Sequence, residues 1–178
     1  MKTCKLFFTL GLVAVMSVSA LAQTASATMN VTAELLQGLQ IVNQVDLNLG
    51  SFVLLDGSNQ GDLTINTVDG EVTSNGLALV SNPTLGSFSV SGSSGTVGIT
   101  IDGSVALGDG SISEFTFSPA AQSGSGAFTA NGDDIVGNAI ISNGVSETIL
   151  IGGTLAGIES SDASGSYSGT ISINVEYQ

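Results

Sequence analysis

The chain has 178 residues with fifteen Asp and Glu, two basic residues and no His, and its formal net charge at pH 7 is −13. Both basic residues, Lys2 and Lys5, lie at the start, so the rest of the chain cannot neutralise phosphates, which excludes nucleic acid as a partner. The composition also removes nucleophile–His pairs, Schiff-base chemistry and cationic transition-state clamps, and leaves only carboxylate pairs for catalysis. Sugar sites commonly use Trp, which the chain lacks, so we expect a non-enzymatic protein.

The first 22 residues have the pattern of a secretory signal peptide. Lys2 and Lys5 form a positive region, residues 6–18 an apolar region, and residues 20–22 a small-residue cleavage site. The apolar run is short for a membrane span. We therefore expect no membrane span after cleavage, and export to the periplasm, the cell surface or the extracellular space. Residues 23–27 then form a short leader, and residues 28–178 form one domain.

Turn signals punctuate the remainder of the chain. Short runs rich in β-branched residues alternate with Asx-Gly pairs, whose residues tolerate the positive φ of tight hairpin turns. This pattern is typical of an all-β sandwich or barrel. Seven pairs occur, beginning at Asp56, Asp69, Asn75, Asp102, Asp109, Asn131 and Asn143.

The first predicted strand alternates apolar residues with polar ones over residues 29–35, and residues 39–42 resume it after Gly38. Leu35, Leu36 and Leu39 would also suit a helical turn. Phe88 and Val90 are predicted to form a hairpin with residues 97–101, around residues 92–95. The other predicted strands are residues 47–55, 62–67, 77–81, 112–118, a short run at Phe128, residues 138–142, and residues 145–158 with a bulge or bend at Gly152 and Gly153.

The clearest strand pattern lies at residues 165–178. Its odd positions include Tyr167, Ile171, Ile173, Val175 and Tyr177, whereas its even positions are all polar. Because side chains alternate between the two faces of a strand, this stretch has one apolar and one wetted face. We expect it to close a single antiparallel β-sandwich.

Two motifs resemble a known family. One is the sequence Asp-Leu-Asn-Leu-Gly at residues 46–50, which precedes an apolar run. The other is Gly165-x-Tyr167-x-Gly169, which leads into the alternating residues of the closing strand. Together they resemble the secreted bacterial family called domain of unknown function 4402, related to spore coat protein U and chaperone–usher pilins. The resemblance implies an immunoglobulin-like, pilin-like sandwich.

The pilin likeness also implies partners. Chaperone–usher subunits tend to have Gly fourteenth from the C-terminus and a penultimate aromatic residue, which here are Gly165 and Tyr177. Their final strand pairs with a periplasmic chaperone by strand addition. The residues implied to face the core or the partner are Gly165, Tyr167, Ile171, Ile173, Val175 and Tyr177. Either residues 29–35 are a donor strand for an identical subunit, or the sandwich is complete and monomeric.

The acidic turns raise a calcium hypothesis, because Ca²⁺ prefers oxygen ligands. Residues 56–61 begin like a calcium loop with Gly at the sixth place, but Thr67 stands where the bidentate Glu is required. Turn chemistry on a solvated surface is the favoured explanation of these residues, and no cofactor is predicted apart from this calcium hypothesis. The weak metal candidates are Asp56, Asp62, Asp102, Asp109, Asp133 and Asp134.

Two functions remain from different classes. The leading hypothesis is an exported structural or adhesive surface component of pilin-like or spore-coat-like type that acts by β-strand pairing. The alternative is a soluble extracellular binding module whose acidic loops bind cations such as calcium.

Overall fold

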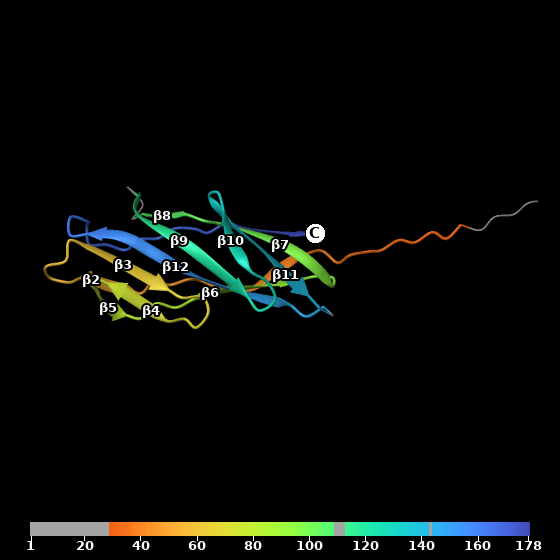
Figure 1. The fold of residues 1–178 in the computed structure, drawn as a ribbon, viewed down its shortest axis with the longest axis horizontal. Helices are drawn as coiled ribbons and strands as arrows, with labels where there is room; N and C mark the ends of the chain where they lie inside the picture. Colours follow the sequence, from red (N-terminus) through yellow and green to blue (C-terminus); the bar gives the residue numbers. More distant parts are fainter. Residues whose placement is uncertain (1–28, 109–112, 143) are drawn as a thin grey trace, which may run out of the picture. The chain divides into compact units, whose positions relative to one another are not determined.

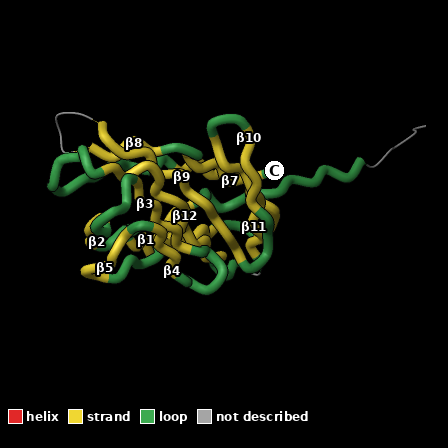
Figure 2. Tube along the Cα trace, turned by 60° about the vertical axis from the view of Figure 1, so that its left-hand side comes forward, coloured by secondary structure: helices red, strands yellow, loops and turns green. Residues whose placement is uncertain are grey.

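The computed structural model describes residues 29–108, 113–142 and 144–178. The predicted signal peptide and leader, and the metal candidate Asp109, lie outside these residues. The described chain consists of strands and loops without a helix (Figure 2), so it contains no helix that could span a membrane. Residues 35–178 form one compact unit, and the described residues before it, 29–34, form no strand.

The described residues form thirteen strands (Figure 1). Their bounds are β1 Gln40–Val45, β2 Ser51–Leu54, β3 Gln60–Ile65, β4 Val72–Asn75, β5 Leu77–Ser81, β6 Gly86–Ser91, β7 Gly95–Asp102, β8 Val105–Gly108, β9 Ser113–Ser123, β10 Phe128–Asn131, β11 Asp134–Ile141, β12 Glu147–Glu159 and β13 Ile173–Tyr177.

The strands pair only in antiparallel fashion, and the predicted all-β sandwich is confirmed. Seven strands form the largest sheet, in the order β1-β6-β12-β3-β4, with β9 pairing β12 and β8 pairing β9. The second sheet has the order β10-β11-β7-β13, and β2 pairs β5 in a third. Strand β13 is therefore an edge strand of the second sheet.

Strand β12 organises the core because it contributes to both of its hydrophobic clusters. Ile149 and Ile151 pack with residues of β6, β7 and β11, in the layer between the two larger sheets. Leu155 and Ile158 pack with residues of β3, β8 and β9, and the β2–β5 sheet adds half-buried residues to this second cluster. One long strand thus joins two packing centres.

Gly152 and Gly153 lie where the strand that pairs with one side of β12 changes from β6 to β3. Strand β6 pairs β12 up to Ile151, and β3 pairs it from Gly153 onward. Of the bulge or bend predicted at this pair, the bulge is wrong, because the register against β9 runs through it without a shift. The bulge lies further on, between Leu155 and Ile158, where Gly157 has a φ of 77°.

The predicted hairpin between Phe88 and Ile101 is also wrong. Strand β6 pairs β1 and β12, whereas β7 pairs β11 and β13, so the two strands belong to different sheets. Phe88 and Val97 nevertheless occupy the same buried cluster. The connection therefore crosses from one layer of the sandwich to the other, and inward-facing side chains from both layers meet between them.

Several predicted strands are shorter than expected. Residues 29–39 form no strand, although β1 begins directly after them. The strand predicted over residues 47–55 is reduced to β2, and that predicted over 165–178 is reduced to β13. An alternating pattern forms a strand only where a neighbouring backbone supplies hydrogen bonds. The turn chemistry is as expected at Gly70 and Gly132, which have positive φ in the hairpins β3–β4 and β10–β11, whereas Gly103 does not have positive φ and lies between strands that do not pair.

Candidate strand-pairing site

The main-chain groups of β13 face two directions. Asp102 N donates to Ser172 O at 3.2 Å and Gln178 N donates to Thr96 O at 3.1 Å, which fixes the even-numbered residues as the hydrogen-bonded partners of β7. In an antiparallel ladder the alternate residues direct N–H and C=O away from that neighbour. The odd-numbered residues of β13 therefore direct these groups toward the open edge of the sheet.

The side chains of the same odd-numbered residues point inward. Ile173, Val175 and Tyr177 are half-buried against the cluster between the two larger sheets, and Asn174 and Glu176 are exposed. Strand β13 thus closes the core with its side chains and leaves one backbone edge without a neighbouring strand. That combination is what strand addition requires.

Several contacts hold the segment before β13, including a backbone bridge between Gly108 and Ser168. The carboxylate of Asp102, one of the metal candidates, accepts a hydrogen bond from Ser172 N at 2.7 Å. The ring of Tyr167 packs edge-on against Phe115 at a centroid distance of 4.4 Å, and its hydroxyl donates to Ala163 O at 2.6 Å. Ile171 packs against both hydrophobic clusters. These contacts position the entry to the edge strand.

The two glycines of the terminal motif differ in role. Gly165 is exposed, and a Cβ there would meet only the ring of Tyr167, at 3.7 Å or more. At Gly169 a Cβ would lie 2.7 Å from Ala106 O and 2.8 Å from Leu107 Cδ2. The close approach that requires glycine is therefore at Gly169. Sequence reasoning placed Gly169 in the motif but selected Gly165 as the site residue.

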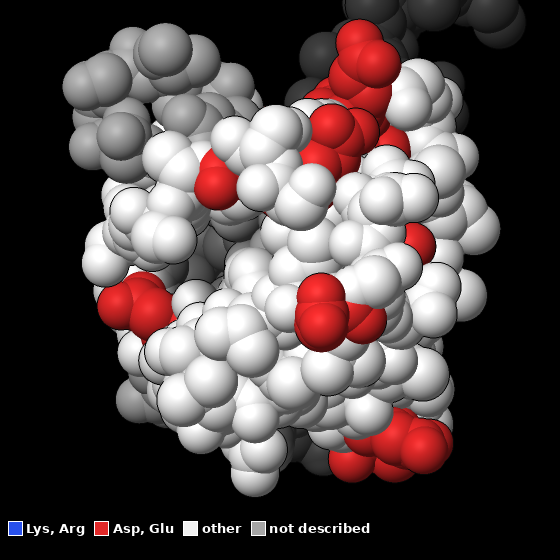
Figure 3. Space-filling model, turned by 90° about the vertical axis from the view of Figure 1, so that its left-hand side faces the viewer, with Lys and Arg blue, Asp and Glu red and all other residues white. Residues whose placement is uncertain are grey.

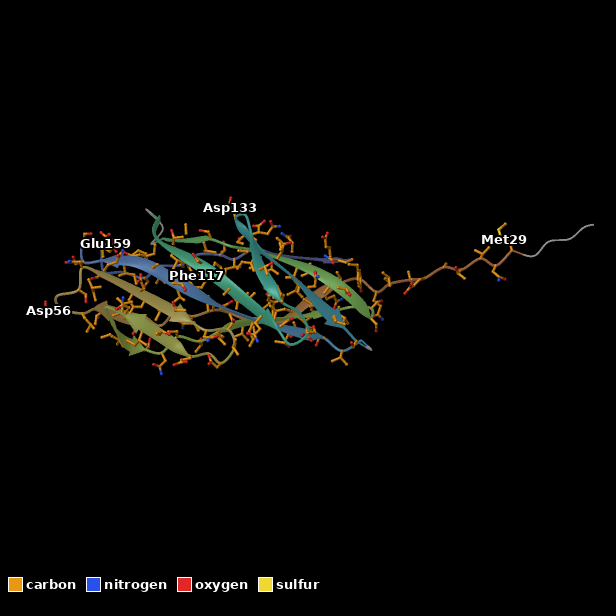
Figure 4. The ribbon with its side chains drawn as sticks, in the orientation of Figure 1. Met29, Asp56, Phe117, Asp133 and Glu159 are labelled. Atoms are coloured by element: carbon orange, nitrogen blue, oxygen red, sulfur yellow. The ribbon has the colours of Figure 1, made fainter. Side chains whose placement is uncertain are left out.

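A groove of about 660 Å³ lies beside residues 167–173 and reaches the first residue of β13. Residues 44–50, which include the motif that precedes β2, also line it. The buried residues Phe88, Phe117 and Ile151 contribute to its lining (Figure 4 labels Phe117). The groove therefore leads from the surface to apolar core side chains, and sequence reasoning did not predict it.

Residues 29–35 retain an unpartnered apolar face. Met29 and Val31 are each 88% exposed, and Leu35 is 96% exposed. The polar residues Asn30, Thr32 and Glu34 alternate with them. Apolar residues in strict alternation are typical of a half-buried strand, yet the described structure pairs this segment with no other strand.

The remaining metal candidates are dispersed. Asp62 accepts a hydrogen bond from Gly157 N at 3.1 Å and so caps the bulge of β12. Asp56, Asp133 and Asp134 are exposed, and Figure 4 shows Asp56 and Asp133 on separate loops. On the face drawn in Figure 3 the acidic side chains form separate patches. Among the residues that the structure describes, no group of three or more potential metal ligands is placed to hold an ion.

The fold and this edge define an all-β sandwich with an open C-terminal strand. The family model described as Domain of unknown function (DUF4402) matches residues 39–177, and the chain belongs to that family. The match spans all the strands of the described residues, from β1 to β13, together with the groove, and it begins after residues 29–38. No curated protein and no solved structure gives a significant match.

Proposed function

We propose that this chain is an exported, non-enzymatic structural or adhesive surface protein that assembles by β-strand pairing. The observation that supports the proposal best is the open edge of β13. There the main-chain groups of Ile173, Val175 and Tyr177 are directed away from β7, and a strand from another chain would hydrogen-bond to them. The partner is an identical subunit or a periplasmic chaperone.

Residues 29–35 are the strand that an identical subunit would supply. Their apolar face is fully exposed in the single chain, and the groove beside residues 167–173 offers apolar core side chains. Burying each of Met29, Val31 and Leu35 would contribute roughly 1.5–3 kcal/mol. The polar face would remain in water, in keeping with the acidic exterior of the protein.

The charge pattern supports a non-enzymatic role at the cell exterior. Asp62 and Asp102 bind backbone amides, and Asp56 and Asp133 lie on separate loops. No pair of them adjoins the groove, since its lining contains only Asp46 among the carboxylates. The signal-peptide pattern of residues 1–22 supports export, and the absence of Lys and Arg after Lys5 suits a protein that functions away from nucleic acid.

The test is sedimentation velocity on protein recovered from expression of the full chain. We expect concentration-dependent oligomers, and we expect Val31→Asp to prevent their formation because it places a charge on the apolar face of the donor strand. Thr32→Asp is the matched control, since it adds the same charge to the polar face, and it should assemble like the unaltered protein. Assembly of identical subunits through residues 29–35 is ruled out if the unaltered protein is monomeric at every concentration, or if Val31→Asp assembles as well as Thr32→Asp.

A further inference from the structure

Three segments that are distant in sequence meet at the hydroxyl of Tyr177. This Oη accepts a hydrogen bond from Ser93 N at 2.6 Å and donates one to Gln37 O at 2.7 Å. Gln37 N in turn donates to Ser93 Oγ at 2.6 Å. The three bonds join the coil before β1, the connection between β6 and β7, and the end of β13.

Gly92 leaves the space that the hydroxyl of Tyr177 occupies. A Cβ at the buried residue Gly92 would lie 2.5 Å from the Oη of Tyr177 and 3.0 Å from Leu39 Cδ2. Any side chain at position 92 would therefore displace the phenol, the coil, or both. Glycine is required here by close approach rather than by backbone conformation.

We infer that the Tyr177 hydroxyl is a latch that fixes the coil of residues 37–39 to the sandwich. No residue of this coil belongs to a strand, and none takes part in the backbone–backbone hydrogen bonds of the described chain. Its polar attachments are the bonds at Gln37, to Tyr177 and Ser93, and its apolar attachment is Leu39, which packs on the core.

The latch determines where the segment before Gln37 leaves the domain. When it is closed, Gln37 is fixed to the sandwich. When these hydrogen bonds break, residues 37–39 are released from the sandwich, and the residues directly before β1 are no longer fixed. This conformational device couples the last strand of the chain to the segment before the first strand. It goes beyond strand pairing and does not depend on it.

Limited proteolysis with thermolysin, which cleaves before Leu and Val, measures the opening directly. The diagnostic bond precedes Leu39, and the bond before Val31 is an internal reference because it lies outside the latch. We expect Tyr177→Phe to accelerate cleavage before Leu39 about tenfold, since it removes both bonds of the hydroxyl and cleavage tracks the open population. Cleavage before Val31 should be unchanged.

Two further variants separate the latch from general loosening. Gly92→Ala should accelerate the same cleavage by displacing the phenol. Tyr167→Phe removes the other tyrosine hydroxyl, which bonds Ala163, and should leave cleavage before Leu39 unchanged. The inference is overturned if Tyr177→Phe is cut before Leu39 at the unaltered rate, or if Tyr167→Phe accelerates the cut equally.

Amide exchange in the unaltered protein provides a test that needs no variant. Because Ser93 N donates to Tyr177 Oη, the Ser93 amide should exchange more slowly than the amide of its exposed neighbour Ser94. Equal exchange at the two amides would contradict the latch even if every variant failed to fold.

Discussion

Gly153 of β12 offers a quantitative test of why the central strand has its glycine pair. Its φ is 142°, in the region that favours glycine, and a Cβ there would overlap Ser118 O and lie 2.8 Å from both Phe117 Cζ and Pro119 Cα. Gly153→Ala therefore combines two costs. Backbone strain contributes about 1–3 kcal/mol, and the forced separation of β12 from β9 contributes about 1–3 kcal/mol.

Gly132→Ala is the matched control for the first cost alone. Gly132 has a φ of 66° in the β10–β11 turn, and a Cβ there would meet no atom within 4 Å. The control should therefore lose only about 1–2 kcal/mol of unfolding free energy. Gly153→Ala should lose about 2–6 kcal/mol in total, because overpacking adds to the strain.

Urea unfolding measures the difference between the two variants. The denaturant slope is about 1–3 kcal/mol per molar urea. The larger loss of unfolding free energy in Gly153→Ala should therefore place its urea midpoint about 1–2 M below that of Gly132→Ala. Equal midpoints for the two variants would refute the reasoning, since the close approach of β9 would then contribute nothing.

Three further predictions concern the edge strand and the acidic surface. Val175→Asp, on the inward face of β13, should lower the unfolding free energy by about 2–4 kcal/mol, whereas Asn174→Asp on the exposed face should change it by less than about 0.5 kcal/mol; equal losses would show that β13 does not close the core. Raising the ionic strength from about 0.01 to 0.1 M should increase Tm by roughly 2–4 °C, because the screening length falls from about 30 to 10 Å and the carboxylates repel less; an unchanged Tm would contradict this. Calorimetric titration with calcium up to about 1 mM should give no saturable heat, since Asp62 and Asp102 already bind backbone amides; saturable binding would favour the cation-binding alternative.

The sequence was sufficient to predict the features that depend on local pattern. The period-two alternation identified the inward side chains of β13, and the strand predicted over residues 112–118 corresponds to the first part of β9. The Asx-Gly pairs marked turns such as that at Gly132, because the conformational freedom of glycine is a local property.

Features that depend on long-range pairing were not predictable. The alternating residues 29–35 have the pattern of a strand, but no strand of the described structure pairs with them. The connection at residues 92–95 has the composition of a hairpin, yet β6 and β7 belong to different sheets. Strand β4 was missed because Val72 is its only apolar residue.

The candidate site was predicted only in part. The closing strand and its inward residues follow from alternation, and the terminal motif led to Tyr177. The partners of the Tyr177 hydroxyl lie 84 and 140 residues away, at Ser93 and Gln37. Such tertiary contacts leave no local sequence signal. For the same reason the close approach at Gly169, which depends on Ala106 and Leu107, could not be read from the motif.

Amide hydrogen exchange along β13 tests the strand-pairing proposal most directly. In the monomer, the amides of Asn174 and Glu176 should be protected by β7, and those of Ile173 and Val175 should exchange quickly because they are directed to the open edge. When the protein assembles, protection should appear at Ile173 and Val175. Assembly that leaves these two amides in fast exchange would contradict pairing at this edge.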